Sequence, residues 1–178
     1  MRRINTIATH VTSNKVSGKM YTGDKLTECA YDNLSGGFCH PKGETNGQNR
    51  FVGKTVIVTG GAGNFGKSCA MRMASEGCNV ALWDIADATA VAEEIKAKYS
   101  GIKAQAFQLD VTDQAAVAAT AQKVKDGFGK IDYLFNNAGY QGDFKKAEGY
   151  DPENFKRVMD INVNGVFFVL QAVEENFS

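Results

Sequence analysis

A glycine-rich turn followed by an acidic residue is the part of the sequence best suited to chemistry. The turn runs from Gly60 to Gly66 and separates a β-branched run at 55–59 from a helical pattern. Glycines let the backbone approach a pyrophosphate without Cβ clashes, and the N-terminus of the following helix offers unpaired N–H groups to the anion. Asp84 comes 18 residues after Gly66, at the end of the next apolar run, where a carboxylate can accept hydrogen bonds from ribose hydroxyls. The pattern predicts a dinucleotide-binding unit.

The acid also indicates which dinucleotide is bound. A carboxylate at Asp84 would repel a 2′-phosphate, and neither Ile85 nor Ala86 is basic, so NAD is favoured over NADP. The simpler alternative is a strand, turn and helix that need glycine only for their geometry. The acid at the expected offset argues against that alternative.

The glycines can be read in two registers. Gly61-x-Gly63-x-x-Gly66 satisfies the general dinucleotide fingerprint. The other register starts at Thr59-Gly60 and ends at Asn64-Phe65-Gly66, with asparagine at a position where a third glycine would be expected. Asparagine is among the few residues other than glycine that tolerate a left-handed backbone, so this register is also open.

Composition limits the class of protein. A chain of 178 residues allows one domain with a tail, and 43% hydrophobic with 22% charged residues suits a packed, water-exposed domain. A formal net charge of zero gives no reason to expect nucleic-acid or membrane partners. The four cysteines show no CxxC spacing, and Cys29 with Cys39 and His40 lacks a fourth metal ligand, so we expect no metal and a reducing compartment.

Residues 1–50 are expected to form a flexible, disordered extension to a domain at 51–178. Apolar residues are scattered there among Gly, Ser, Thr and Asn. The first acid is Asp24, after four basic residues, and a basic, hydroxyl-rich start also resembles a mitochondrial transit peptide. A reducing compartment and an ordinary disordered tail favour the cytoplasm, and a transit peptide at the start would instead place the protein in the mitochondrial matrix.

Strands and helices alternate through the rest of the chain. Strands are expected at 55–59, 80–84, 103–109 and 131–135. Helices are expected from the turn to Gly77, over 87–99, from 112 or 113 to about 128, and from Asp151 onward, the last with one long buried face that includes Phe155. Alternation of this kind requires a parallel sheet with right-handed crossovers. The fold class is α/β, a Rossmann-like doubly wound sheet, here incomplete, with strand order 3-2-1-4.

From residue 51 on, the chain resembles the short-chain dehydrogenases/reductases. The family's landmarks stand in its order and at its usual intervals: Thr59-Gly60…Gly66, Asp84, Asp110-Val111, Asn136-Asn137-Ala138-Gly139 and Asn162-Val163-Asn164-Gly165. The resemblance implies an oxidoreductase that transfers hydride between a nicotinamide and a small alcohol or carbonyl compound.

The resemblance also implies roles for individual residues. Cofactor-binding positions would be Gly60, Asn64, Phe65 and Gly66 at the pyrophosphate, Asp84 and Ile85 at the adenosine ribose, Asp110 and Val111 at the adenine, and Asn137, Ala138 and Gly139 at the nicotinamide-side ribose. Asn162 would interrupt a helix and hold a water in the catalytic proton relay. The alternative for Asn162 is an amide that only satisfies a bend in the chain.

The family's catalytic serine and Tyr-x-x-x-Lys are not matched in the resembling region. Tyr21 and Lys25 have that spacing, but they lie in the polar extension, and we interpret them as a chance match. We therefore expect a truncated cofactor-binding portion that is inactive alone, from a full-length protein that forms homodimers or homotetramers. The alternatives are a non-catalytic NAD-binding or interaction module that ends at Ser178, and a split enzyme completed by another chain.

Overall fold

The computed structural model describes residues 18–22, 25–30, 40–41 and 49–176, and of those before residue 49 only the backbone. The chain divides into two compact units, Ile7–Gly47 and a larger unit that contains Gln48–Ser178. In the smaller unit, β1 (Gly18–Thr22), β2 (Lys25–Ala30) and β3 (His40–Pro41) form an antiparallel sheet. The proposed transit segment, most of the proposed flexible extension, and the side chains of Tyr21, Lys25, Cys29, Cys39 and His40 lie outside what is described.

The larger unit is a four-stranded parallel sheet in the order β6-β5-β4-β7. Its strands are β4 (Thr55–Thr59), β5 (Asn79–Asp84), β6 (Ala104–Gln108) and β7 (Tyr133–Phe135). Counted along this unit, the order is 3-2-1-4, which confirms the predicted Rossmann-like arrangement.

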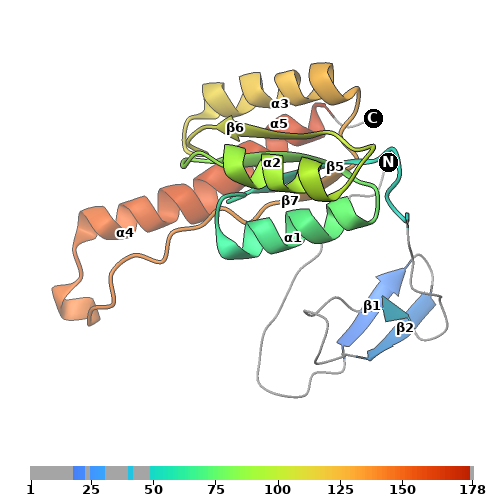
Figure 1. The fold of residues 1–178 in the computed structure, drawn as a ribbon. Helices are drawn as coiled ribbons and strands as arrows, with labels where there is room; N and C mark the ends of the chain where they lie inside the picture. Colours follow the sequence, from blue (N-terminus) through green and yellow to red (C-terminus); the bar gives the residue numbers. More distant parts are fainter. Residues whose placement is uncertain (1–17, 23–24, 31–39, 42–48, 177–178) are drawn as a thin grey trace. The chain divides into compact units, whose positions relative to one another are not determined.

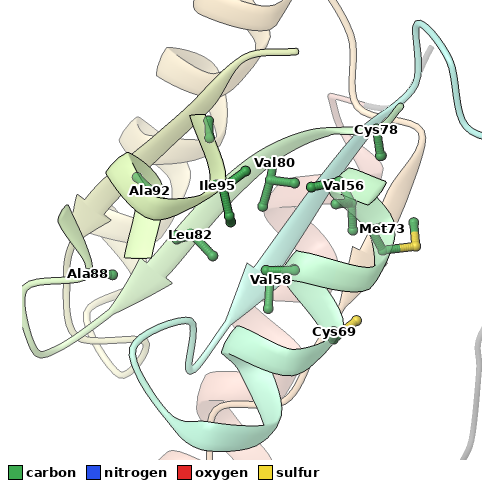
Figure 2. Packing of buried hydrophobic residues seen from close by; sticks show 13 residues of the cluster. Val56, Val58, Cys69, Met73, Cys78, Val80, Leu82, Ala88, Ala92 and Ile95 are labelled. Carbon is green, nitrogen blue, oxygen red and sulfur yellow. The ribbon is translucent and has the colours of Figure 1, made fainter. Parts of the chain in front are cut away.

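Helices cover both faces of this sheet (Figure 1). Helices α1 (Asn64–Ser75) and α2 (Thr89–Lys98) pack on one face, and α3 (Gln114–Phe128) and α5 (Val166–Glu174) pack on the other. Alternate residues of each strand point to opposite faces. Val56, Val58, Val80 and Leu82 therefore meet α1 and α2, as Figure 2 shows, whereas Ile57, Ala81 and Trp83 meet α3 and α5.

The helix ends follow local chemistry. Asp113 caps α3 by accepting a hydrogen bond from Ala116 N at 3.0 Å, and Gly129 ends the helix in a left-handed conformation. Asp151 caps α4 (Pro152–Met159), whose first residue is a proline, as predicted. The N-cap of α2 is Ala88, one residue later than the expected N-cap Asp87, whose carboxylate accepts hydrogen bonds from the Thr89 N–H and hydroxyl.

The final helical segment departs from the prediction. It contains a π-helical stretch, Asp160–Gly165, between α4 and α5. Val169 and Val173 of α5 are fully buried, but α4 buries none of its residues, and Phe155 is 56% exposed. The expected buried face is therefore wrong at its start, because α4 extends away from the sheet (Figure 1), and the residues of 140–150 that contact α4 leave Phe155 exposed.

Candidate functional site

The predicted site residues gather at one edge of the sheet. Strand pairing places Thr59 beside Trp83, Asp84 beside Gln108 and Val58 beside Phe135, so the four parallel strands end at the same edge. The segments that follow those ends are the glycine turn, Asp84-Ile85, Asp110-Val111 and Asn136–Gly139. In open parallel sheets, ligands bind outside the carboxyl ends of the strands, at the point where the strand order reverses.

The glycine turn is closely packed, and several of its glycines leave no room for a Cβ atom. Gly60 has φ +68°, and a Cβ on it would lie 2.8 Å from Asn137 Nδ2. A Cβ on Gly66 would lie 2.0 Å from the carbonyl oxygen of Gly60. The start of α1 therefore lies directly against the turn. A Cβ on Gly61 would also lie only 2.9 Å from Leu82 Cβ, so the packing fits both registers. The left-handed φ of Gly60 is the feature that favours the register beginning at Thr59-Gly60.

Asn64 is accommodated for a different reason from the one expected. It is the first residue of α1 and exposed, with a helical backbone rather than a left-handed one. The N-cap, Gly63, has no side chain with which to cap the helix, and the first turn carries no acidic residue. The first N–H groups of an α-helix lack partners within the helix, so this end can accept an anion. Phe65 beside it is 82% exposed.

The Asp84 side chain is hydrogen-bonded to the backbone of the glycine turn. Its Oδ2 accepts a hydrogen bond from Ala62 N at 2.9 Å, and its Oδ1 accepts one from Ala86 N at 2.9 Å. An ionised carboxylate has about four lone-pair sites, so both oxygens retain capacity for further donors. Ile85 beside it is 62% exposed. Ribose hydroxyls are donors that this partly exposed carboxylate can accept.

Asp110 and Val111 follow β6 on the other side of β5. The Asp110 carboxylate accepts bonds from the Thr112 N–H and hydroxyl, at 2.9 and 2.8 Å, which fixes the turn before α3. Val111 is 8% exposed and packs against the backbone of Gly165, where a Cβ would lie 2.8 Å from Val111 Cγ2. Because β6 pairs with β5 as far as Asp84 and Gln108, both residues follow directly after the strand end beside Asp84.

Thr59 connects the glycine turn to the segment after β7. Its buried hydroxyl accepts bonds from Asn137 N at 2.8 Å and Ala138 N at 2.9 Å, and it donates to Asn136 Oδ1 at 3.2 Å. Asn136 also donates to the Val166 carbonyl, and Asn137 Nδ2 donates to the Thr59 carbonyl. Sequence reasoning gave Thr59 and Asn136 no role of their own, because their partners come from distant segments.

Asn162 lies in the π-helical stretch and pairs with the backbone of Tyr140. Its Oδ1 accepts from Tyr140 N at 2.7 Å, and its Nδ2 donates to the Tyr140 carbonyl at 2.9 Å. A Cβ on Gly139 would lie 3.4 Å from Asn162 Oδ1. The helix interruption expected at Asn162 is present, and its amide fastens the segment that leaves β7. Its place in a proton relay stays a prediction.

The expectation that the region from residue 51 on holds no Tyr-x-x-x-Lys spacing is wrong: Tyr99 and Lys103 have this spacing, but they lie away from this site. Tyr99 is the C-cap of α2, and Lys103 precedes β6, at the amino ends of the strands. Lys103 Nζ donates to the Gly127 carbonyl at 2.8 Å. The pair is therefore at the opposite edge of the sheet from Asp84, where it cannot act on a ligand of the glycine turn.

Other chemistry is limited among the described residues. They contain no cluster of three His, Cys, Asp or Glu side chains that could hold a metal ion. Burial raises the pKa of the Cys69 thiol to about 11 and that of the Cys78 thiol to about 12, so neither is a reactive nucleophile at neutral pH. None of the helices described is both long and apolar enough to cross a membrane.

Comparison with known proteins places this geometry in context. The model of the short chain dehydrogenase family matches residues 54–178. A 2-dehydro-3-deoxy-L-rhamnonate dehydrogenase (NAD(+)) from Sphingomonas sp. is 42% identical over 126 residues, which are 70% of this chain and 48% of that protein.

Solved structures agree with the sequence comparison. An NAD+-bound xylitol dehydrogenase superposes with a TM-score of 0.65 and 43% identity, over 71% of this chain and 49% of that one. A short chain dehydrogenase from Burkholderia cenocepacia in complex with NADP gives a TM-score of 0.67 and 31% identity, over 73% and 53%. The chain thus spans about half the length of the relatives it matches.

Proposed function

We propose, since the chain belongs to the short chain dehydrogenase family, that residues 54–178 are the cofactor-binding portion of an oxidoreductase that uses NAD. One observation carries the proposal: the glycine turn and Asp84 form a single hydrogen-bonded unit at the carboxyl edge of the sheet. A pyrophosphate at the start of α1 and a ribose at Asp84 are the two parts of one ligand that such a unit fits.

Each predicted residue has a place in binding this ligand. Backbone N–H groups at Asn64, Phe65 and Gly66 would face the pyrophosphate. Ile85, Asp110 and Val111 would flank the adenosine, and the small residues of Asn137-Ala138-Gly139 would allow close backbone approach on the nicotinamide side.

The preference for NAD over NADP rests on charge. A 2′-phosphate would lie next to the Asp84 carboxylate, and the adjacent Ile85 and Ala86 supply no cation to offset the repulsion. Solved structures of relatives contain either cofactor, so the preference proposed here rests on the charge at Asp84 alone.

The reaction we propose for the whole protein is hydride transfer between the nicotinamide and a small alcohol or carbonyl compound. The bound nicotinamide supplies or accepts the hydride. The residues of this chain orient it and shape the surroundings, with Asn162 proposed for the relay. The Ser and Tyr-x-x-x-Lys that would move the proton are not matched at this edge, so we expect no turnover from this chain alone.

NAD binding to the 178-residue chain, measured by isothermal titration calorimetry, tests the proposal. Gly66→Ala should abolish measurable binding, because its Cβ would collide with the Gly60 carbonyl oxygen. Gly127→Ala is the matched control, since it adds the same methyl group in α3, where nothing lies within 4 Å, and it should leave binding unchanged. No heat of NAD binding by the wild-type chain, with its fold intact by circular dichroism, would reject the proposal.

Self-association of the full-length protein is a further part of the proposal. Phe155, Met159, Val163 and Phe167 repeat every four residues along α4, the π-helical stretch and α5, and each is at least 41% exposed. An exposed apolar stripe of this kind favours a protein partner, and the resemblance implies a homodimer or homotetramer. Sedimentation velocity of the full-length protein tests this: the wild type should sediment as an oligomer, and Phe167→Lys should sediment as a monomer.

The compartment, cytoplasm or mitochondrial matrix, stays a prediction from residues 1–50.

A further inference from the structure

The segment between β7 and α4 is held by the side chain of one asparagine. Asn154 Nδ2 donates to the Tyr140 hydroxyl at 3.2 Å, and Asn154 Oδ1 accepts from the Tyr150 hydroxyl at 2.9 Å and from Asp143 N at 3.3 Å. Asn154 thus contacts the beginning, middle and end of residues 140–150. We propose that Asn154 is a positioning residue, which fixes this segment on α4 and thereby sets the nicotinamide side of the cofactor site.

The packing around Asn154 leaves little room for the segment to shift. Gly142 has φ +72°, and a Cβ on it would lie 2.2 Å from the Tyr150 hydroxyl oxygen and 2.9 Å from Asn154 Oδ1. The guanidinium of Arg157 lies over the Tyr140 ring, 4.9 Å from its centroid. The Tyr140 side chain is therefore held from α4 by both a hydrogen bond and a cation–π contact.

Tyr140 links this cluster to the site. Its side chain is bound to Asn154, whereas its backbone N–H and carbonyl are both bound to the Asn162 amide. The residue before it is Gly139, the last of the small residues that we place beside the nicotinamide. If release of the Tyr140 side chain lets its backbone shift, the Gly139 backbone or the Asn162 amide has to move with it.

Hydrogen bonds, rather than hydrophobic packing, hold the segment 140–150 against α4. Residues 140–150 contain only a short 3-10 turn, Ala147–Gly149, and α4 buries none of its side chains. Tyr140, Tyr150 and Asn154 are half-buried, which makes their mutual hydrogen bonds less accessible to water than those of the exposed residues around them. Loss of the Asn154 amide would leave the segment without its common anchor.

Amide hydrogen exchange of the whole 178-residue chain, resolved by NMR, tests the first step. Asn154→Leu keeps the side-chain size and removes all three bonds. Asp143 N also donates to the Tyr150 hydroxyl at 3.2 Å, but that hydroxyl loses its own bond to Asn154, so exchange should rise at least tenfold at both Asp143 and Tyr140. Asn154→Asp is the conservative variant: its carboxylate can accept from both tyrosine hydroxyls and from Asp143 N, so protection should return. Faster exchange at Asp143 with unchanged protection at Tyr140 would overturn the proposal, because the anchor would then be local.

Ligand affinity tests the second step, which rests on the proposed function. Asn154→Leu should weaken NAD several-fold and leave ADP-ribose, which lacks the nicotinamide, unchanged. Equal weakening of both ligands would show a general structural defect and overturn the positioning role. Gly142→Ala is a second variant that disturbs the same cluster, and Gly101→Ala, also at positive φ but with open space, is its control. Absence of NAD binding by the wild type would reject the proposed function, whereas the exchange data would still decide whether Asn154 anchors Tyr140.

Discussion

The carboxylate of Asp84 accepts a hydrogen bond from the backbone N–H of Ala62, with 2.9 Å between Oδ2 and N. The residue that ends β5 therefore stabilises the turn that follows β4. A second bond, from Gly61 N to the Trp83 carbonyl at 3.1 Å, joins the same two segments. A change at Asp84 must consequently affect both halves of the proposed cofactor site.

Asp84→Asn is expected to weaken NAD binding about tenfold, or roughly 1.4 kcal/mol. An amide accepts hydrogen bonds from ribose hydroxyls less strongly than a carboxylate does. Its NH2 group must also face one of the two backbone N–H donors, Ala62 N or Ala86 N. NADP should lose less affinity or gain some, because the repulsive charge is removed. Calorimetric dissociation constants for both cofactors check the ratio.

Asp87→Asn is the matched control for this change. Asp87 is an exposed acid three residues later, and its hydrogen bonds to Thr89 hold the pKa of its carboxyl below the usual value. The hydrogen bonds described for Asp87 do not reach the glycine turn. The ratio of NAD to NADP affinity in Asp87→Asn should therefore stay as in the wild type. An unchanged preference in Asp84→Asn would contradict the assignment of Asp84.

Thr59→Val should destabilise the fold more than its small change in shape suggests. Valine keeps the size of the side chain but removes the hydroxyl, which leaves the N–H groups of Asn137 and Ala138 without their acceptor. Each unsatisfied buried donor costs about 1–3 kcal/mol, so for the two donors we expect the free energy of unfolding to fall by about 2–6 kcal/mol.

Thr59→Ser retains the hydroxyl and serves as the control, with an expected loss of about 1 kcal/mol for the methyl group. Urea unfolding can be followed by the fluorescence of Trp83, the single tryptophan of the sequence, which is fully buried on the neighbouring strand. Equal losses for valine and serine would show that the hydroxyl contributes nothing.

Sequence patterns predicted the parts of the fold that depend on local chemistry. The β-branched run at Thr55–Thr59 forms a strand buried on both faces, and the alternation of strands and helices gives the observed strand order. Asp113, Gly129 and Asp151 end or begin helices because capping needs only a few neighbouring residues.

The remaining features depend on contacts between distant segments. The Thr59 hydroxyl and the Asn162 amide are bonded to backbone 78 and 22 residues away, respectively, and no spacing rule signals such partners. Phe155 fits a helical apolar pattern, but periodicity does not say whether another surface covers that face. Asn64 was accepted in the glycine pattern because asparagine tolerates a left-handed backbone, whereas the structure begins a helix at that residue.

The two cysteines of the larger unit predict how stability depends on alkaline pH. Burial holds the pKa of Cys69 at about 11 and that of Cys78 at about 12, above the ordinary value of 9.0. Below pH 9 each thiol is protonated in both the folded and the unfolded chain, so its contribution to stability is constant. Between pH 9 and the folded pKa the unfolded chain binds fewer protons, so the free energy of unfolding falls as the pH rises.

The expected decrease is about 1–2 kcal/mol per thiol between pH 9 and pH 10.5, since one pH unit corresponds to about 1.4 kcal/mol per proton. Urea unfolding at pH 8 and at pH 10.5 measures it. Cys78→Ala lowers stability at both pH values but should remove about half of the thiol-dependent decrease, and Cys69→Ala with Cys78→Ala should remove nearly all of it. All other ionisable residues are the same in every variant, so the comparison isolates the two thiols. If the double variant loses as much stability as the wild type between the two pH values, the buried thiols are not the cause.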